Sequence, residues 1–221
     1  VNSLERILDA LRKAVSNNPT PTAVGDAENS AASRIDFHNK LSELRNAILA
    51  AGDNRYPIAS LVGKSADGLK GLAKDGDIDA LAYRYALKEL NPFAVLGADY
   101  SRFNQNGALN LYDKATGTGE LTDAWLADRA AMLAWKLKLA TEDRSTSHSF
   151  PYAYNQRAFF DDRAGGEKIY LDSAALPTQR PYYVFGADNA EADLEGGSLG
   201  DLLYGGGLNV TEGLGSRVLR A

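Results

Sequence analysis

The end of the chain recurs with a nine-residue period, and this period limits its fold more than any other feature of the sequence. From Gly186 onward the chain is rich in glycine and aspartate and has no helical pattern. Written in nines, ADNAEADLE, GGSLGDLLY and GGGLNVTEG align, and Leu194 lies nine residues before Leu203. The period is typical of the parallel β-roll repeat G-G-x-G-x-D-x-U-x, in which aspartates and carbonyls hold Ca²⁺ and the apolar U residue fills a thin core. The sequence therefore predicts the start of a β-roll.

This repeat is degenerate. The positions in register are Gly196, Gly197, Asp201 and Leu203. Leucines replace the fourth-position glycine in two turns, and the last turn has Val210 and Glu212 at its aspartate and U positions. Only Asp201 stands at an aspartate position, while Asp188 and Asp193 lie out of register. Because such sites need carboxylates from neighbouring turns, these three aspartates are the candidate Ca²⁺ ligands.

The upstream part of the chain has the apolar spacing of helices. Apolar residues recur at three- and four-residue steps over residues 3–15, 31–50, 65–74, 78–91 and 122–140. In the last of these, Thr122 is the expected N-cap, and Leu121 before it can close over Leu126. The expected apolar face comprises Leu126, Ala130, Leu133, Leu137 and Ala140.

The helix at 78–91 has signals at both ends. Asp77 is its expected N-cap, and Pro92 disfavours a helical conformation at Asn91. The residues expected on its apolar face are Ile78, Leu81, Ala82 and Tyr85.

Short extended segments separate and follow these helices. YPIASLVGK at 56–64 is extended, and ALNLYD at 108–113 alternates well enough to be a strand. AFFDDRAGGEKIYLDS is expected to form two strands around Gly165-Gly166, and PYYVFG another. We therefore expect an α+β fold, with a mostly helical domain at 1–145. A β-rich region at 146–221 would contain short β-hairpins and the start of the degenerate β-roll.

Composition excludes several classes of protein. The net charge is −5 with both signs spread along the chain and no basic block, so nucleic acid is not an expected partner. Cysteine is absent, which excludes disulfides and thiolate metal sites. The apolar runs are too short for a membrane span. No signal peptide is visible, and the chain starts at Val1, so we expect a fragment of a longer protein.

Gly196 to Gly200 forms a literal G-x-S-x-G, the sequence of the lipase nucleophile elbow around Ser198. The elbow requires a buried strand before the serine and a helix after it, whereas the preceding NAEADLE is polar and DLLYGGG is too short for the helix. The two histidines, His38 and His148, both precede the serine, while that fold needs one after it. We therefore interpret Ser198 as a turn residue and expect no catalytic residue.

Two other patterns carry possible chemistry. Asp161, Asp162 and Glu167 could supply a carboxylate pair of the kind that glycosidases use, although acidic pairs are common in loops. In a helix–loop–helix calcium loop counted from Arg102, the ligand and glycine positions would fall on Asn104, Asn106, Gly107, Leu109 and Asp113. Position 1 would then be a cation where a carboxylate is needed, so a turn and a strand are the preferred interpretation.

Several long strings carry a family resemblance. They are AYRYALKELNPFAVLGADYSRFNQNGALNLYDKATGTGELTDAWLADRAAMLAW, FFDD…GGEKIYL, YVFGADNAEADLEGGSLGDLLYGGG and GDAENSAASRIDFHNKL, and together they extend from about residue 26 to residue 207. This region resembles the segment of large bacterial RTX proteins, which carry haemolysin-type calcium-binding repeats. The segment lies between a lipase-type α/β-hydrolase domain and those repeats. The resemblance implies type I secretion and folding driven by Ca²⁺ outside the cell.

The expected function follows from the resemblance. It implies a non-catalytic helical linker or scaffold module of a secreted lipase-like protein, leading into Ca²⁺-binding repeats, with the adjacent domains of that protein as partners. One alternative is a surface- or ligand-binding module that presents the aromatic-rich segment 93–112. Another is a free-standing serine hydrolase. The ligand and the oligomeric state stay open.

Overall fold

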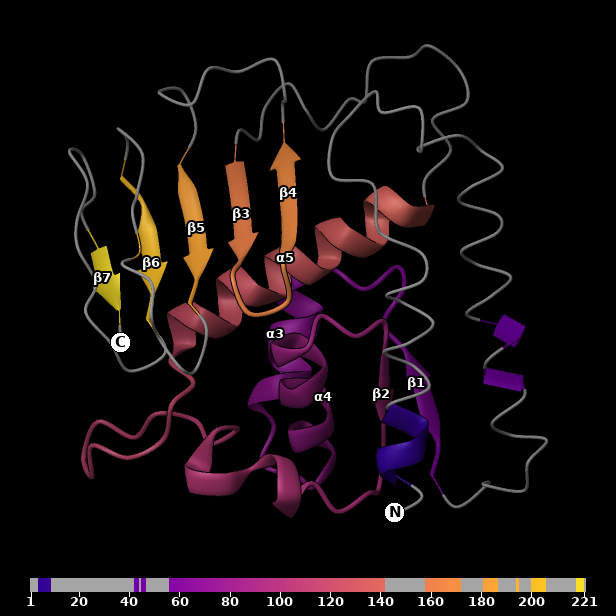
Figure 1. Ribbon diagram of the computed structural model, residues 1–221. Coiled ribbons are helices and arrows are strands. Elements are labelled where there is room, and N and C mark those ends of the chain that lie inside the picture. Colours follow the sequence, from indigo (N-terminus) through magenta and orange to yellow (C-terminus); the bar gives the residue numbers. More distant parts are fainter. Residues whose placement is uncertain are drawn as a thin grey trace, which may run out of the picture. The chain divides into compact units, whose positions relative to one another are not determined.

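Two compact units make up the chain. The computed structural model describes residues 4–8, 42–43, 45–46, 56–141, 158–171, 181–186, 194, 200–205 and 218–220. Unit 1 comprises residues 1–20 and 31–142, and unit 2 comprises residues 21–30 and 143–221. Figure 1 shows their helices and strands, coloured along the sequence.

Unit 1 is built on helices and a small sheet. Its long helices are α3 (Ala66–Lys74), α4 (Asp79–Lys88) and α5 (Asp123–Thr141). Helix α3 packs against α4 and α5, and α4 also packs against strand β2. The antiparallel sheet consists of β1 (Ile58–Ser60) and β2 (Phe93–Val95). Two short 3-10 helices follow, η2 (Ser101–Phe103) and η3 (Gln105–Gly107). Residues 4–8 and the described residues of 42–46 are helical, as predicted.

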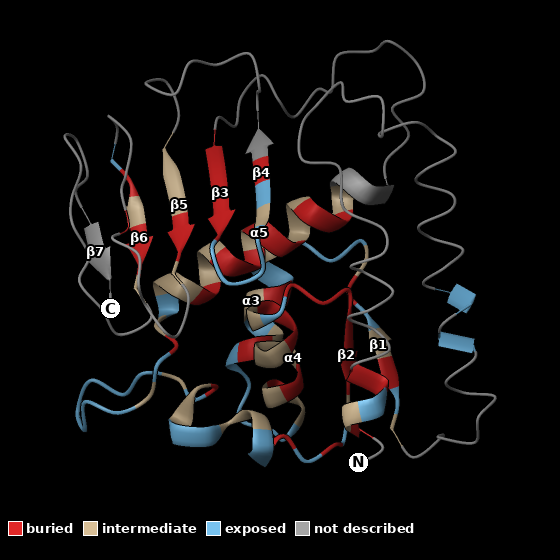
Figure 2. Ribbon diagram, viewed as in Figure 1, coloured by how far each residue is buried: buried red, intermediate tan, exposed pale blue. Residues whose placement is uncertain are grey.

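The predicted apolar face of α5 lies in the core of unit 1 (Figure 2). Its buried residues include Leu126, Ala130, Leu133 and Leu137. Thr122 Oγ1 accepts a hydrogen bond from Trp125 N at 3.2 Å, so the predicted N-cap is confirmed. Leu121, before the cap, is also buried. The side chain of Ala140 lies outside the described residues.

The predicted apolar face of α4 is partly wrong. Ile78 is 62 % exposed, because it lies in the capping turn before the first helical residue. Asp77 Oδ1 accepts from Ala80 N at 3.0 Å, which confirms the predicted capping. The helix ends at Lys88, before Pro92, as expected. Its buried residues are Ala80, Ala82, Ala86 and Leu87.

Two arginines connect the helices of unit 1 by donating to carbonyls at the C-terminal ends of α3 and α4. Arg84 of α4 donates from Nε to the carbonyl of Ala73, near the end of α3, at 2.7 Å. Arg129 of α5 is buried and donates from Nε to the carbonyl of Leu87 at 2.8 Å. Its Nη2 donates to the carbonyl of Lys88, the last residue of α4. Each guanidinium thus satisfies carbonyls that a helix end leaves without a helical partner.

The strand predicted at 108–113 is wrong. Leu111 and Asp113 make only isolated bridges, to Leu121 and Thr118 respectively. The chain reverses immediately after Asp113, whose amide donates to the Thr118 carbonyl at 2.7 Å. The segment therefore forms a narrow loop closed on itself, and no strand among the described residues pairs with it in a ladder.

Gly119 lets this loop close, and we expect Gly119→Ala to destabilise unit 1. Its φ is +89°, and a Cβ there would lie 2.1 Å from the Leu111 carbonyl oxygen. The expected loss is about 2–4 kcal/mol, since left-handed strain and a backbone clash add together. Gly117→Ala is the matched control, because its φ of +66° imposes similar strain while nothing lies within 4 Å of its Cβ. Urea unfolding followed by tryptophan fluorescence measures both, and equal losses would contradict the close approach.

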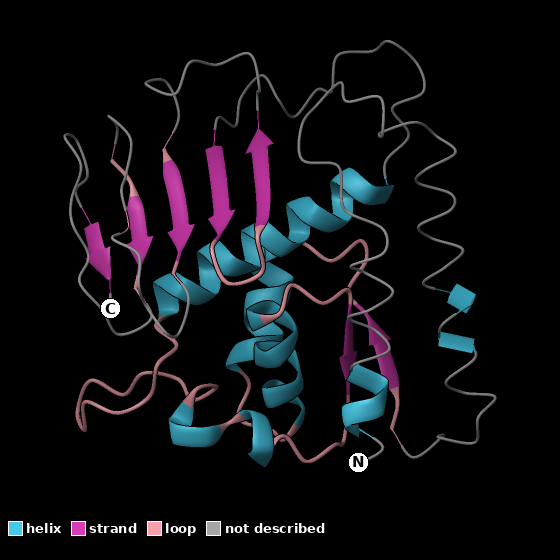
Figure 3. Ribbon diagram, viewed as in Figure 1, coloured by secondary structure: helices cyan, strands magenta, loops and turns pink. Residues whose placement is uncertain are grey.

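Unit 2 contains a five-stranded sheet with the order β4-β3-β5-β6-β7 (Figure 3). The strands are β3 (Ala158–Asp162), β4 (Glu167–Leu171), β5 (Tyr182–Phe185), β6 (Leu202–Tyr204) and β7 (Val218–Arg220). Strands β3 and β4 pair antiparallel, which confirms the hairpin predicted around Gly165-Gly166. The pairs β3–β5, β5–β6 and β6–β7 are parallel. The strand predicted at PYYVFG is confirmed as β5.

The parallel strands recur at intervals near twice nine residues. Tyr183 lies opposite Leu202, 19 positions later, and Leu202 lies opposite Val218, 16 positions later. Val184, Leu194 and Leu203 form a buried cluster. Helices with two sheets confirm the predicted α+β class. The β-roll stays a prediction, because much of the chain between these strands lies outside the described residues.

Candidate functional site

Three buried aspartates mark the candidate site in unit 2, two at the end of β3 and one directly before β6. Asp161 and Asp162 end β3 and are 1 % and 4 % exposed, and Asp201, directly before β6, is fully buried. Burying a carboxylate is costly unless it is paired or hydrogen-bonded. The surroundings of these three side chains therefore decide what the sheet can do.

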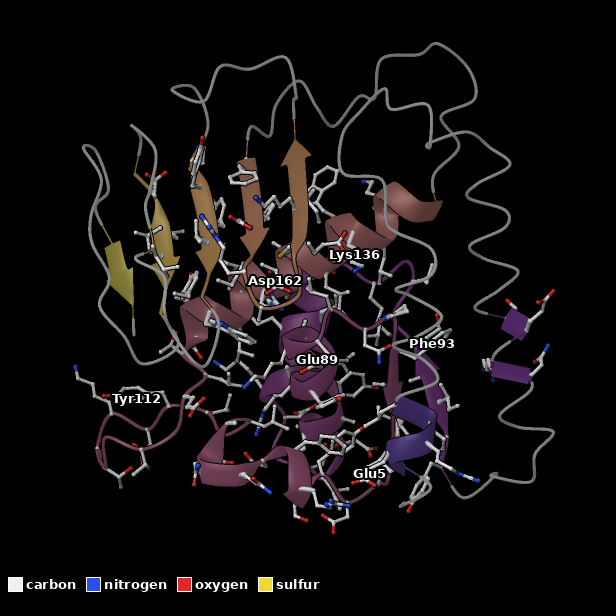
Figure 4. The ribbon with its side chains drawn as sticks, in the orientation of Figure 1. Glu5, Glu89, Phe93, Tyr112, Lys136 and Asp162 are labelled. Carbon is white, nitrogen blue, oxygen red and sulfur yellow. The ribbon has the colours of Figure 1, made fainter. Side chains whose placement is uncertain are left out.

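Of the three acids considered as a catalytic pair, the structure places Asp162 opposite Glu167, and not Asp161 beside Asp162. Successive side chains of a strand point to opposite faces, so these two neighbours lie on opposite faces of β3. Asp162 lies opposite Glu167 in the antiparallel ladder, and Asp161 lies opposite Val184 in the parallel one. Figure 4 labels Asp162 on its strand. With 4 % of its surface exposed, Asp162 is itself closed to a substrate.

Asp161 has one paired and one orphaned oxygen. Its Oδ2 lies 2.6 Å from Arg163 Nε, while buried Oδ1 has no hydrogen-bond partner among the described residues. Burial raises the pKa of Asp161 above its usual value, and the neighbouring charge of Asp162 adds to this. The positive charges of Arg163 and Lys168 oppose the shift.

We expect Asp161→Asn to remove a pH dependence of unit 2. The raised pKa means that native protein binds this proton more tightly than the unfolded chain. The stability that the Asp161 carboxyl contributes is fully present below its pKa in the unfolded chain. This stability is lost as the pH rises through its pKa in the native protein. Calorimetric melting over a pH series should show the wild type losing stability relative to Asp161→Asn as the pH rises above about 4.

Asp113→Asn is the control of opposite sign. Hydrogen bonds from the Ala115 amide and the Thr116 hydroxyl hold the pKa of Asp113 below its usual value. Its stabilisation is therefore present above the unfolded pKa and is lost as the pH falls through the folded pKa. Difference curves of the same sign for the two variants would refute the assignment for Asp161.

Asp201 is the one candidate Ca²⁺ ligand among the described residues, since Asp188 and Asp193 lie outside them. Its Oδ1 accepts a hydrogen bond from Tyr182 N, the first amide of β5, at 2.8 Å. In the part of the chain that the structure describes, no three His, Cys, Asp or Glu side chains gather as they would around a metal ion. The described residues alone do not make up a calcium site, and calcium binding by the three aspartates stays a prediction.

The nucleophile elbow has the wrong structural context. Ser198, His38 and His148 lie outside the described residues, but β6 begins at Leu202, four residues after the serine. An elbow serine needs a helix at this place, whereas Leu202–Tyr204 is a strand.

Asn104, a ligand position of the alternative calcium loop, hydrogen-bonds within the protein. Arg102, at its first position, forms an ion pair with Glu5. Asn104 Oδ1 accepts from Leu109 N at 2.8 Å, and its Nδ2 donates to Asn110 Oδ1 at 2.8 Å. These contacts stabilise the turn around the 3-10 helices. Both polar atoms of the Asn104 side chain therefore already hydrogen-bond to the protein.

The aromatic residues of segment 93–112 mostly pack inward. Phe93 and Tyr100 are buried, and the Tyr100 hydroxyl donates to the Val95 carbonyl at 2.9 Å. The Tyr100 and Phe103 rings also contact Tyr85, at centroid distances of 5.5 and 4.9 Å. Tyr112, 47 % exposed, stands out on the surface (Figure 4). One exposed ring does not make an aromatic binding face.

No family model matches the chain, and neither the curated proteins nor the solved structures include a match. Among the described residues, no helix combines the length and the apolar character needed to cross a bilayer.

Proposed function

We propose that this chain is a non-catalytic module of a secreted bacterial RTX lipase-like protein. In this proposal the helices of unit 1 brace a neighbouring domain, and unit 2 begins the parallel strands that lead into nonapeptide repeats. Location outside the cell after type I secretion belongs to the same proposal, and so do the adjacent domains as partners.

The observation that best supports this proposed function is the packing of Leu194 against Val184 and Leu203. Leu194 and Leu203 are the residues that the nine-residue alignment puts at the U position, which fills the thin core of a roll. Leu203 follows Val184 by 19 positions in an adjacent parallel strand, and Leu194 lies between them in sequence. A circuit of about two nonapeptides accounts for both facts.

The two alternatives have less support. A ligand-binding role for segment 93–112 would need exposed aromatic rings, whereas Phe93 and Tyr100 belong to the core. A free-standing hydrolase would need a helix after Ser198, where β6 lies instead.

An esterase assay of the purified chain with chromogenic esters tests the proposal. We expect no turnover above the uncatalysed rate, and no difference between wild type and Ser198→Ala. Hydrolysis by the isolated chain that Ser198→Ala abolishes would overturn the proposal in favour of a serine hydrolase. Reading the coding region upstream of Val1 is the complementary test, and a lipase-type domain there is the expected result.

A further inference from the structure

The buried carboxylate of Asp201 lies where the nonapeptide alignment expects a calcium ligand, but it makes a different contact. It accepts the amide hydrogen of Tyr182, which is 19 positions earlier and begins the neighbouring parallel strand. The next pair in the ladder is Tyr183 opposite Leu202. The Asp201 side chain thus supplies an acceptor at the point where the β5–β6 ladder starts.

This contact helps to stabilise the buried carboxylate. A backbone amide that donates to a carboxylate forms a charge-assisted hydrogen bond, about twice as strong as a neutral one. Donation by Tyr182 uses one of the lone pairs of this oxygen without requiring an ion.

Other contacts between the same strands need no ion. Phe160 stacks on Tyr183 with centroids 4.8 Å apart, and Phe185 stacks on Tyr204 with centroids 5.1 Å apart. Phe159 meets Tyr182 edge to face at 4.8 Å. Such aromatic pairs stabilise a sheet beyond the apolar area that they bury. Side-chain contacts therefore connect β3 to β5 and β5 to β6.

We propose that Asp201 joins β5 to β6 by its direct hydrogen bond, and that β3, β5 and β6 fold as a sheet without calcium. The inference rests on the proposed function only in regarding Asp201 as the sixth residue of a nonapeptide. It makes unit 2 an ion-independent first segment, to which calcium-dependent repeats of a longer protein are added.

Hydrogen exchange of the full chain, resolved on peptides that cover β5 and β6, tests this with calcium chloride or with the chelator EGTA. We expect equal protection of both strands in the two conditions. Asp201→Ala should reduce this protection roughly tenfold or more, the effect of losing a hydrogen bond to a charged acceptor. Asp201→Asn keeps an acceptor oxygen and should retain most of the protection, again without a calcium effect.

Two results would overturn the proposal. One is protection of β5 and β6 in the wild type that rises tenfold or more with calcium and no longer does so in Asp201→Asn. The other is absence of protection in both conditions. The wild-type comparison decides even if Asp201→Ala fails to fold. Ester hydrolysis by the chain would refute the proposed function and leave these exchange results unaffected.

Discussion

Arg129→Met should lower the free energy of unfolding of unit 1 by about 3–5 kcal/mol, the expected loss for two hydrogen bonds from a charged donor. Arg129 is 3 % exposed, so water cannot replace it at the carbonyls of Leu87 and Lys88. Because methionine retains much of the side-chain volume, the loss of unfolding free energy measures mainly the lost hydrogen bonds of Arg129. Urea unfolding followed by far-ultraviolet circular dichroism measures it, since α3, α4 and α5 all contribute to the helical signal.

Two control variants separate this effect from charge alone. Arg129→Lys keeps the charge but loses the planar fork, so it should still lose at least half as much stability. Arg102→Met removes an ion pair with Glu5 from a side chain that is 65 % exposed, and should change the stability by about 0.5 kcal/mol or less. A loss below about 1 kcal/mol in Arg129→Met would mean that water or a neighbouring side chain satisfies both carbonyls in its place.

Leu203→Ala should lower the stability of unit 2 by about 2–4 kcal/mol, as for other fully buried leucines. Leu203 is fully buried against Val184 and Leu194, so truncation opens a cavity in a small core. Calorimetry measures the shift in melting temperature, and hydrogen exchange shows whether β5 and β6 lose protection together.

Leu202→Ala is a control from the adjacent position. Leu202 is half-buried on the other face of β6, so its truncation should cost about 1 kcal/mol or less. A one-residue shift of β6 would exchange the faces of these two leucines. A larger loss in Leu202→Ala than in Leu203→Ala would therefore show that the pairing of Tyr183 with Leu202 is incorrect.

Elements decided by local interactions were predictable from the sequence. Helix α5 was readable because the Thr122 cap and the apolar spacing both act within a few residues. The strand predicted at 108–113 failed because its alternation is local, whereas the Gly119 approach to Leu111 joins residues in separate parts of the loop. Arg129 was missed, although a signal existed: it lies three residues after Leu126, on the predicted apolar face.

The candidate site was predictable only in part. The nonapeptide alignment selected Asp201, but its partner is an amide 19 residues earlier, and only the strand register determines that contact. The burial of Asp161 was equally unreadable, because an Asp-Asp pair before a glycine turn is usually found in a solvated loop. Its Arg163 partner, two positions on and thus on the same face, was the available sign.

From β3 onward, the parallel strands lie beside one another in the order in which the chain presents them. Each of these strands finds its partner in the segment that precedes it, apart from the β4 hairpin at one edge. The energetics of such an array approach those of a one-dimensional chain, in which each unit is coupled only to its nearest neighbours. Damage at β6 should accordingly spread outward to β7, while the β3–β4 hairpin keeps its structure and unit 2 unravels from one end.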